Sequence, residues 1–313
     1  MESQSHFEVA IIGGGPAGMA AAQVLGRQRR RVVLLDGHQG RNAAASSVHM
    51  LLGREGMTPE GLVLAARREL AGLHTVSLLL TEATNVLVED SRVLVSAVAA
   101  GTICADFLIL ATGVVDVLPP IPGVGSAYGT CLFHCPLCHG FEAQDQRLVV
   151  LGNSEHAAFM AAYVHDRISR DVELCSNGKP DFCAGTRERL RRGGIRIEDR
   201  DVVGIRASAG GLALLMGDST VRTYNAGFLS TRFRQGSPLP HALGCCLTDD
   251  GRVQVDHFQR TSVPRVLAVG DMAKAATAAG NMTFVATAVA SGVTAAAYLD
   301  EDIFAKTWDT QGS

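Results

Sequence analysis

Two cysteines three residues apart carry the strongest chemical signal in this 313-residue chain. They lie in the run Cys135-Pro136-Leu137-Cys138-His139. Because proline suits the first turn of a helix, Cys135 should lie near a helix N-terminus, where the pKa of a thiol falls and its thiolate becomes the attacking sulfur. His139 follows one helical turn later, and its usual pKa of about 6.5 suits proton transfer during thiol exchange. The run predicts a redox-active dithiol, with Cys135, Cys138 and His139 as catalytic residues.

The same run is compatible with a haem site or a metal site. C-x-x-C-H is the attachment sequence of c-type haem, which requires an exported chain. A zinc site could use Cys131 or His134 together with residues of the run, but no second C-x-x-C pair completes a tetrahedron. We therefore expect a redox dithiol and no metal.

Charge, composition and cysteine usage narrow the class of protein. A net charge of −3 offers no basic surface for nucleic acid, and 47% hydrophobic against 19% charged residues excludes a disordered chain. The first apolar run, Val9–Ile12, gives way at once to glycines instead of continuing as a signal-peptide core. We therefore expect a cytoplasmic protein whose eight cysteines are reactive or core residues, not a disulfide scaffold.

A glycine-rich turn near the start of the chain satisfies the dinucleotide pattern G-x-G-x-x-G. Gly13 permits a tight turn, Gly15 lets a pyrophosphate approach the backbone, and Gly18 lets helix and strand pack closely. Asp36 ends the next apolar strand, where an acid would accept a hydrogen bond from the adenosine ribose. The pattern predicts a nucleotide site that includes Gly13, Gly15, Pro16, Ala17, Gly18 and Asp36.

A second, weaker version of this turn begins at Gly152. Ser154 stands where the second glycine is expected, and its side chain obstructs the approach of a phosphate. The following strand ends in residues 175–178, Cys-Ser-Asn-Gly, without an acid for a ribose or arginines for a 2′-phosphate. We expect that the second domain keeps a nucleotide-binding fold but has lost the nicotinamide nucleotide.

The elements that position these residues alternate between strands and helices, as in parallel α/β folds. The predicted elements are strand 9–12, helix 16–27, strands 32–35, 106–110 and 148–151, helix 155–166, and strands 171–175 and 265–269. A long helix of small residues should then run to Leu299. The uncharged stretch between Lys274 and Asp300 contains Asn281, which favours a buried helix over a membrane span.

We expect the chain to pass from one domain to the other twice. The first linker is the Pro/Gly-rich stretch 119–123, and the second lies near residues 236–247. We expect a discontinuous first domain, residues 1–117 and 246–313, that binds the nucleotide. A second domain, residues 118–245, is inserted into it and carries the dithiol. The predicted fold class is α/β with two Rossmann-like domains.

The joint pattern resembles the low-molecular-weight thioredoxin reductase family over nearly the whole chain. The resemblance rests on the first glycine turn, Ala111-Thr112-Gly113, the C-x-x-C pair at the start of a second Rossmann unit, and Gly270-Asp271 before a long helix. It implies three-layer ββα domains, a homodimer, and FAD, with Cys138 facing the flavin and Cys135 exchanging with substrate. We expect the flavin contacts at Gly13, Gly15, Pro16, Ala17, Gly18, Asp36, Arg41, Asn42, His49, Ala111, Thr112, Gly113, Asp271 and Ala279.

Three departures from thioredoxin reductases point to a different electron flow. His139 replaces an aspartate, Ser154 replaces a glycine, and the arginine run that binds the NADPH 2′-phosphate is missing. The run Cys-Pro-Leu-Cys-His-Gly, with Gly40-Arg41-Asn42 upstream, is similar instead to the dithiol oxidases that close the disulfides of gliotoxin, holomycin and romidepsin. This resemblance implies that a small-molecule dithiol reduces the cysteine pair, and that electrons pass through FAD to O₂, giving H₂O₂.

Two other functions stay open at the level of the sequence. The chain could be a disulfide reductase that receives electrons from NAD(P)H or ferredoxin. It could also be a flavin-binding protein with a sensory or interaction role. Reduction of the flavin by dithiols, and its response to NADPH, would distinguish the three.

Overall fold

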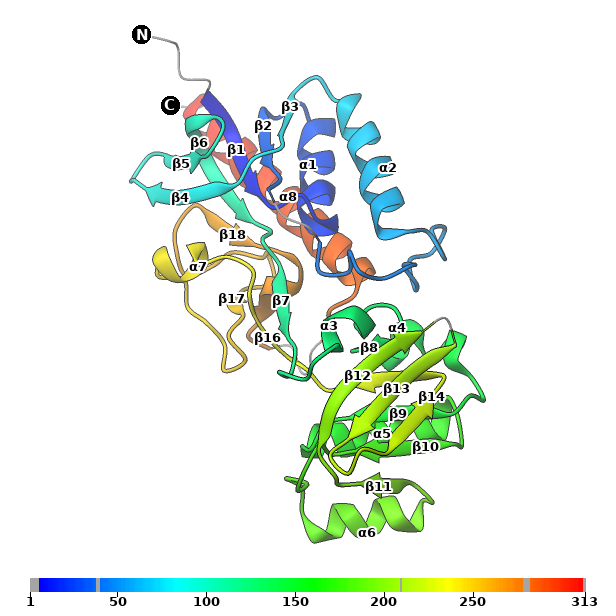
Figure 1. Cartoon of the computed structure of the whole chain (residues 1–313). Helices are drawn as coiled ribbons and strands as arrows, with labels where there is room; N and C mark the ends of the chain where they lie inside the picture. The colour runs from blue at the N-terminus through cyan, green and yellow to red at the C-terminus, as the bar shows by residue number, and fades with distance from the viewer. Residues whose placement is uncertain (1–5, 38–39, 209, 278–281, 312–313) are drawn as a thin grey trace. The chain divides into compact units, whose positions relative to one another are not determined.

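The computed structural model describes residues 6–37, 40–208, 210–277 and 282–311 (Figure 1). The chain forms two compact units. The first contains Met1–Arg41, Met50–Val115 and Arg234–Ser313, and the second contains Asn42–His49 and Asp116–Phe233. The chain therefore re-enters the first unit at Arg234 and not at residue 246, the boundary expected from the sequence. The physical reason is that strand β16 (Arg232–Gln235) pairs with β7 (Val114–Val117), the strand in which the chain leaves the first unit.

The first unit is built on a seven-stranded sheet with the order β3-β2-β1-β6-β5-β4, and β18 pairs with β6. Its strands are β1 (His6–Ile12), β2 (Val32–Leu35), β3 (Val76–Leu79), β4 (Ala83–Val88), β5 (Val93–Ala97), β6 (Gly101–Leu110) and β18 (Val266–Ala268). β1, β2, β3, β6 and β18 are parallel, and β4 and β5 extend the sheet as an antiparallel hairpin. The apolar runs of β1 and β2 are buried because a parallel sheet is covered on both faces.

Three helices accompany this sheet: α1 (Pro16–Arg27), α2 (Pro59–Ala71) and α8 (Val285–Gln311). α1 and α8 lie side by side (Figure 1) and share one core with β1 and β2. They approach closely at Gly292, where a Cβ would collide with the carbonyl oxygen of Ala17. α8 runs past Leu299, the end predicted from the sequence. Among the described residues, no helix is long and apolar enough to cross a membrane.

The second unit contains a parallel sheet with the order β11-β10-β9-β15-β8 and an antiparallel sheet with the order β12-β13-β14. The parallel strands are β8 (Leu132–Phe133), β9 (Leu148–Leu151), β10 (Val172–Cys175), β11 (Arg196–Glu198) and β15 (Ala226–Leu229). The antiparallel strands are β12 (Val202–Ser208), β13 (Gly211–Met216) and β14 (Val221–Tyr224). Helices α5 (Glu155–Arg167) and α6 (Ala184–Arg192) pack on the parallel sheet through one core, and the antiparallel sheet packs through another.

Short elements complete both units. In the first they are α7 (Leu239–Ala242), β17 (Val253–Val255), η2 (Gly270–Met272) and β19 (Ala273–Ala275). In the second they are α3 (Val124–Ala127), α4 (Pro136–His139) and η1 (Phe141–Ala143). The structure confirms the predicted α/β class, because each unit has a parallel sheet whose strands are joined by helices.

Candidate active site

The glycine turn after β1 is closed on one side and open on the other. Gly13 has a positive φ of 114°, and a Cβ there would collide with the carbonyl oxygen of Ala111. A Cβ at Gly18 would collide with the carbonyl oxygen of Gly13, which explains the close packing of α1 on β1. At Gly15 a Cβ would meet nothing within 4 Å. The turn therefore leaves an open cradle at Gly15, beside the N-terminus of α1, and this arrangement fits the pyrophosphate of a dinucleotide.

Asp36, directly after β2, lies against this turn. A Cβ at Gly14 would collide with the Asp36 carboxyl group, and the Asp36 side chain is only 7% exposed. Arg67 from α2 donates a hydrogen bond of 2.7 Å to Asp36 Oδ2. No sequence pattern indicates Arg67, because it lies among other polar residues of a helix whose partners depend on packing.

The ends of β6 and β18 bring further predicted residues to the same edge of the sheet. Thr112 donates from its backbone N (3.1 Å) and its Oγ1 (3.2 Å) to Met272 Sδ. In η2, Asp271 forms an ion pair of 3.0 Å with Arg41. Cofactors of open α/β sheets bind at the carboxyl ends of parallel strands, where these residues lie.

For three of the predicted flavin contacts, the structure adds no geometry at the glycine turn. Asn42 and His49 belong to the segment that is part of the second unit, whereas Arg41 belongs to the first. Ala279 lies outside the described residues, and the helix expected after it begins at Val285.

Cys135 and Cys138 form a disulfide in the second unit. Cys135 precedes α4 as its N-cap, with Pro136 as the first helical residue, as the sequence predicted. The backbone N–H of Cys138 donates to Cys135 Sγ over 3.1 Å. Both cysteines are half-buried, so the pair combines access for an incoming thiol with a hydrogen bond that stabilises negative charge on the Cys135 sulfur.

The side chain of His139, the last residue of α4, is held by contacts with other rings. Its imidazole stacks on Phe133, with centroids 4.1 Å apart and planes at 7°. In the described part of the structure, both ring nitrogens are buried without a hydrogen-bond partner, which costs about 1–3 kcal/mol for such a group. Burial lowers the pKa of His139, and positive charge on His49 lowers it further, whereas Glu142 acts in the opposite direction. Burial therefore favours the neutral form of this ring, whose nitrogens have no hydrogen-bond partner among the described residues.

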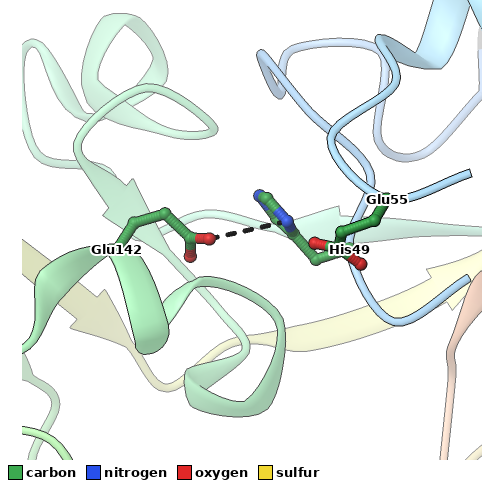
Figure 2. Close-up of side chains that lie close together, drawn as sticks. All are labelled: His49, Glu55 and Glu142. Carbon is green, nitrogen blue, oxygen red and sulfur yellow. Dashed lines mark ion pairs between the residues drawn. The ribbon is translucent and has the colours of Figure 1, made fainter.

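Two residues, His49 and Glu142, lie near His139 in the folded chain. His49 meets the His139 ring edge-on, with centroids 5.6 Å apart. Glu142 lies in η1, and its Oε1 is 3.5 Å from His49 Nδ1 (Figure 2). Glu142 follows His139 by about one helical turn, and this spacing could have indicated that the two side chains are neighbours. The sequence analysis predicts His49 as a flavin contact and not as a neighbour of His139, from which it is far away along the chain.

In the second unit, the turn after β9 is occupied by side chains of the chain itself. Ser154 caps α5, and its Oγ accepts a hydrogen bond from Ala157 N. The Glu155 carboxylate accepts hydrogen bonds of 2.8 Å from Cys183 N and from Thr186 Oγ1. An acid of the first turn of α5 thus uses donors at the start of α6 that could otherwise receive an anion.

Hydrogen bonds and ion pairs within the chain also hold the strand ends beside this turn. Asp181 N donates to Asn153 O over 2.7 Å, which ties the segment after β10 to the turn. Ser176 Oγ donates to the carbonyl of Gly178. At the end of the neighbouring β11, the Glu198 carboxylate is ion-paired with Arg200 and Arg222, and hydrogen bonds from Arg200 lower its pKa to about 2.

The two units and the cysteine pair define a class, the disulfide oxidoreductases built from two nucleotide-type domains. Residues 7–292 match the pyridine nucleotide-disulphide oxidoreductase family, and the chain belongs to this family. It is a thioredoxin reductase-like flavoprotein with FAD as its cofactor.

Three similar proteins illustrate the family relationship. The chain is 30% identical over 293 residues to thioredoxin reductase tcpT of Claviceps purpurea, covering 87% of this chain and 88% of that protein. It is 32% identical over 181 residues to a probable thioredoxin reductase of Arthroderma benhamiae, covering 56% of this chain but only 45% of that protein. The crystal structure of HlmI superposes with a TM-score of 0.89 at 31% identity, covering 98% of this chain and 95% of that chain. The predicted thioredoxin reductase-like fold is confirmed.

Proposed function

We propose that the protein is an FAD-dependent dithiol oxidase that closes the intramolecular disulfide of a small-molecule dithiol. The overall reaction converts one dithiol and one O₂ into one disulfide and one H₂O₂. The observation that carries the proposal is the contrast between the two glycine turns. The first has an open cradle at Gly15, whereas in the second Ser154 stands in place of that glycine and caps α5 through the hydrogen bond that it accepts from Ala157 N. Electrons are therefore expected from the dithiol and not from a nicotinamide.

The first step is proton removal from the substrate. A free nitrogen of His139 accepts the proton of one substrate thiol, and the resulting thiolate attacks Cys135 Sγ. The Cys135–Cys138 bond breaks, a mixed disulfide forms between substrate and Cys135, and Cys138 leaves as a thiolate.

The second step closes the product. The Cys138 thiolate takes the first proton from His139, which can then accept the proton of the remaining substrate thiol. This second thiolate attacks the substrate sulfur of the mixed disulfide, so Cys135 leaves. The hydrogen bond from Cys138 N to Cys135 Sγ stabilises the departing thiolate. Two electrons and two protons have then moved from the substrate to the cysteine pair and its base.

FAD, held by Gly13, Gly15, Gly18, Asp36 and Thr112 with their neighbours, would supply two-electron acceptance and reoxidation by O₂ when bound. We also propose that Arg41 and Asp271 border this cofactor, and that the protein acts as a cytoplasmic homodimer.

The experiment that tests the proposal uses the purified flavoprotein and a panel of small dithiols, with matched monothiols as controls. A dithiol should bleach the oxidised flavin absorbance under anaerobic conditions. In air it should be consumed with one O₂ taken up and one H₂O₂ formed per disulfide. Absence of flavin reduction by every dithiol, or O₂ uptake with monothiols of the same size, would contradict the oxidase.

A disulfide reductase is the second candidate, favoured by the thioredoxin reductase names of the similar proteins. Rapid, stoichiometric flavin bleaching by NADPH at micromolar concentration would support this function instead. Reduction by a ferredoxin, with no oxidase turnover, would support the ferredoxin-linked form.

A further inference from the structure

The ring of His139 is enclosed by aromatic neighbours that leave its nitrogens free. Phe133 covers one face in a parallel stack, and His49 contacts the ring at an interplanar angle of 87°. Neither contact uses a nitrogen of His139. The orientation of the proposed base is therefore set by packing, so a residue that moves His49 also moves the surface against which His139 rests.

His49 is itself held at both nitrogens. Ser47 Oγ lies 2.8 Å from His49 Nε2, and Glu142 Oε1 lies 3.5 Å from His49 Nδ1 (Figure 2). The His49 side chain is only 11% exposed. When His49 is protonated, its Nδ1 can donate toward the Glu142 carboxylate and its Nε2 can donate to Ser47 Oγ.

Charge around His139 depends on the same two residues. Within the described part of the second unit, the charged groups that shift the pKa of His139 are His49, from the segment 42–49, and Glu142, from η1. Positive charge on His49 disfavours a proton on His139, whereas the Glu142 carboxylate favours one. The two effects on the pKa of His139 oppose each other, so replacing His49 should raise this pKa and replacing Glu142 should lower it.

We propose that His49 and Glu142 act as a positioning pair for His139, holding its ring and balancing its charge while it takes up and returns thiol protons. This inference rests on the proposed dithiol exchange. It assigns to His49 a role in the second unit in place of a contact to the cofactor. Glu142, which is 46% exposed, acts through His49 and through solvent-screened charge, and it does not touch the cysteine sulfurs in this assignment.

The first test reads His139 directly, without substrate. In the isotope-labelled oxidised flavoprotein, NMR titration of the imidazoles should show a lower pKa for His139 in Glu142→Gln and a higher pKa in His49→Gln. Glu142→Asp should restore most of the wild-type value. Glu188→Gln on α6 and His156→Gln on α5 remove an exposed carboxylate and an exposed imidazole, and they should leave the titration unchanged.

The second test measures anaerobic flavin reduction by a dithiol across pH. His139→Ala should slow reduction by about 10²–10⁴-fold, the usual loss of a general base. Glu142→Gln and His49→Gln keep the base itself, so each should slow reduction by less than about 10²-fold. The acidic limb of the pH profile should move to lower pH in Glu142→Gln and to higher pH in His49→Gln. Reoxidation by O₂ should be unaffected in all three.

The outcomes separate this inference from the proposed function. If the wild-type flavin is not reduced by dithiols, the proposed function fails, whereas opposite NMR shifts still support the pair. If dithiols reduce the wild type, and both variants titrate like it or shift in the same direction, the pair is overturned. Circular dichroism identifies a misfolded variant, and His49→Asn then replaces His49→Gln.

Discussion

Two cysteines of the same loop are expected to differ in reactivity because their surroundings differ. Cys135 precedes α4 and its Sγ accepts the backbone N–H of Cys138, whereas Cys138 lies inside the short helix. Donors directed at a sulfur stabilise its thiolate and lower its pKa. At the same loop, burial favours the neutral form of His139, which we propose as the proton acceptor. We therefore expect the backbone to distinguish Cys135, which exchanges with the substrate in the proposed reaction, from Cys138.

A matched pair of serine variants tests this assignment. The exposed Cys183 and Cys246 are first replaced by serine so that they do not react. In that background, Cys138→Ser should attack a pyridyl disulfide at least about tenfold faster than Cys135→Ser, because the backbone N–H that stabilises the Cys135 thiolate is kept. Release of the pyridine thione gives the rate, and intact mass identifies the adduct. Equal rates, or a faster Cys135→Ser, would exchange the two roles.

At the scale of elements, strand β1, the glycine turn after it and helix α1 form one motif, in which each glycine has a separate role. Gly13 and Gly18 carry no side chain because backbone atoms lie where a Cβ would stand. Gly15 faces open space, and its φ of −78° is accessible to any L-residue. The fold therefore does not require a glycine at this position, and we propose that the cofactor does.

Two alanine variants separate these tasks. Gly15→Ala should fold with a stability near that of the wild-type apoprotein but bind FAD at least about tenfold more weakly, because its methyl group enters the pyrophosphate space. Gly18→Ala should lower the free energy of unfolding by about 1–3 kcal/mol, the usual cost of overpacking. Denaturant unfolding of the apoproteins and flavin titration measure the two effects. A destabilised Gly15→Ala with normal FAD affinity would contradict the separation.

The whole molecule consists of two units with related folds and different nucleotide turns. Both place a glycine turn between a buried parallel strand and a helix, β1 and α1 in one, β9 and α5 in the other. In the second unit, Glu155, Ser154 and the segment around Asp181 use the hydrogen-bonding groups of that turn among themselves. Such a unit keeps its core because the fold depends on buried apolar strands and not on a ligand.

NADPH is therefore expected to be a poor donor. At equal concentrations it should reduce the flavin roughly a hundredfold more slowly than a good dithiol, since each lost charge-assisted phosphate contact weakens binding by about tenfold or more. Stopped-flow absorbance under anaerobic conditions provides the comparison, with NADH as a control for any effect of the 2′-phosphate. Saturable, fast bleaching by micromolar NADPH would show that the second turn still accepts a nucleotide.

The sequence alone determined the elements and the local chemistry. Apolar runs and glycine turns predicted β1, α1, β2, β9, α5 and β10 to within a few residues, because burial and turn geometry are local properties. The C-x-x-C-H run likewise predicted Cys135 at the start of a helix and His139 one turn later, since three or four residues span one turn.

Tertiary structure alone decided which distant residues meet. Arg67 pairs with Asp36, Met272 with Thr112, and His49 with His139, and none of these pairs shares a sequence pattern. The return of the chain at Arg234 and the extension of α8 to Gln311 were likewise missed. The physical reason is that side-chain partners and strand pairing depend on contacts across long loops, whereas periodicity and turn residues report only on neighbours along the chain.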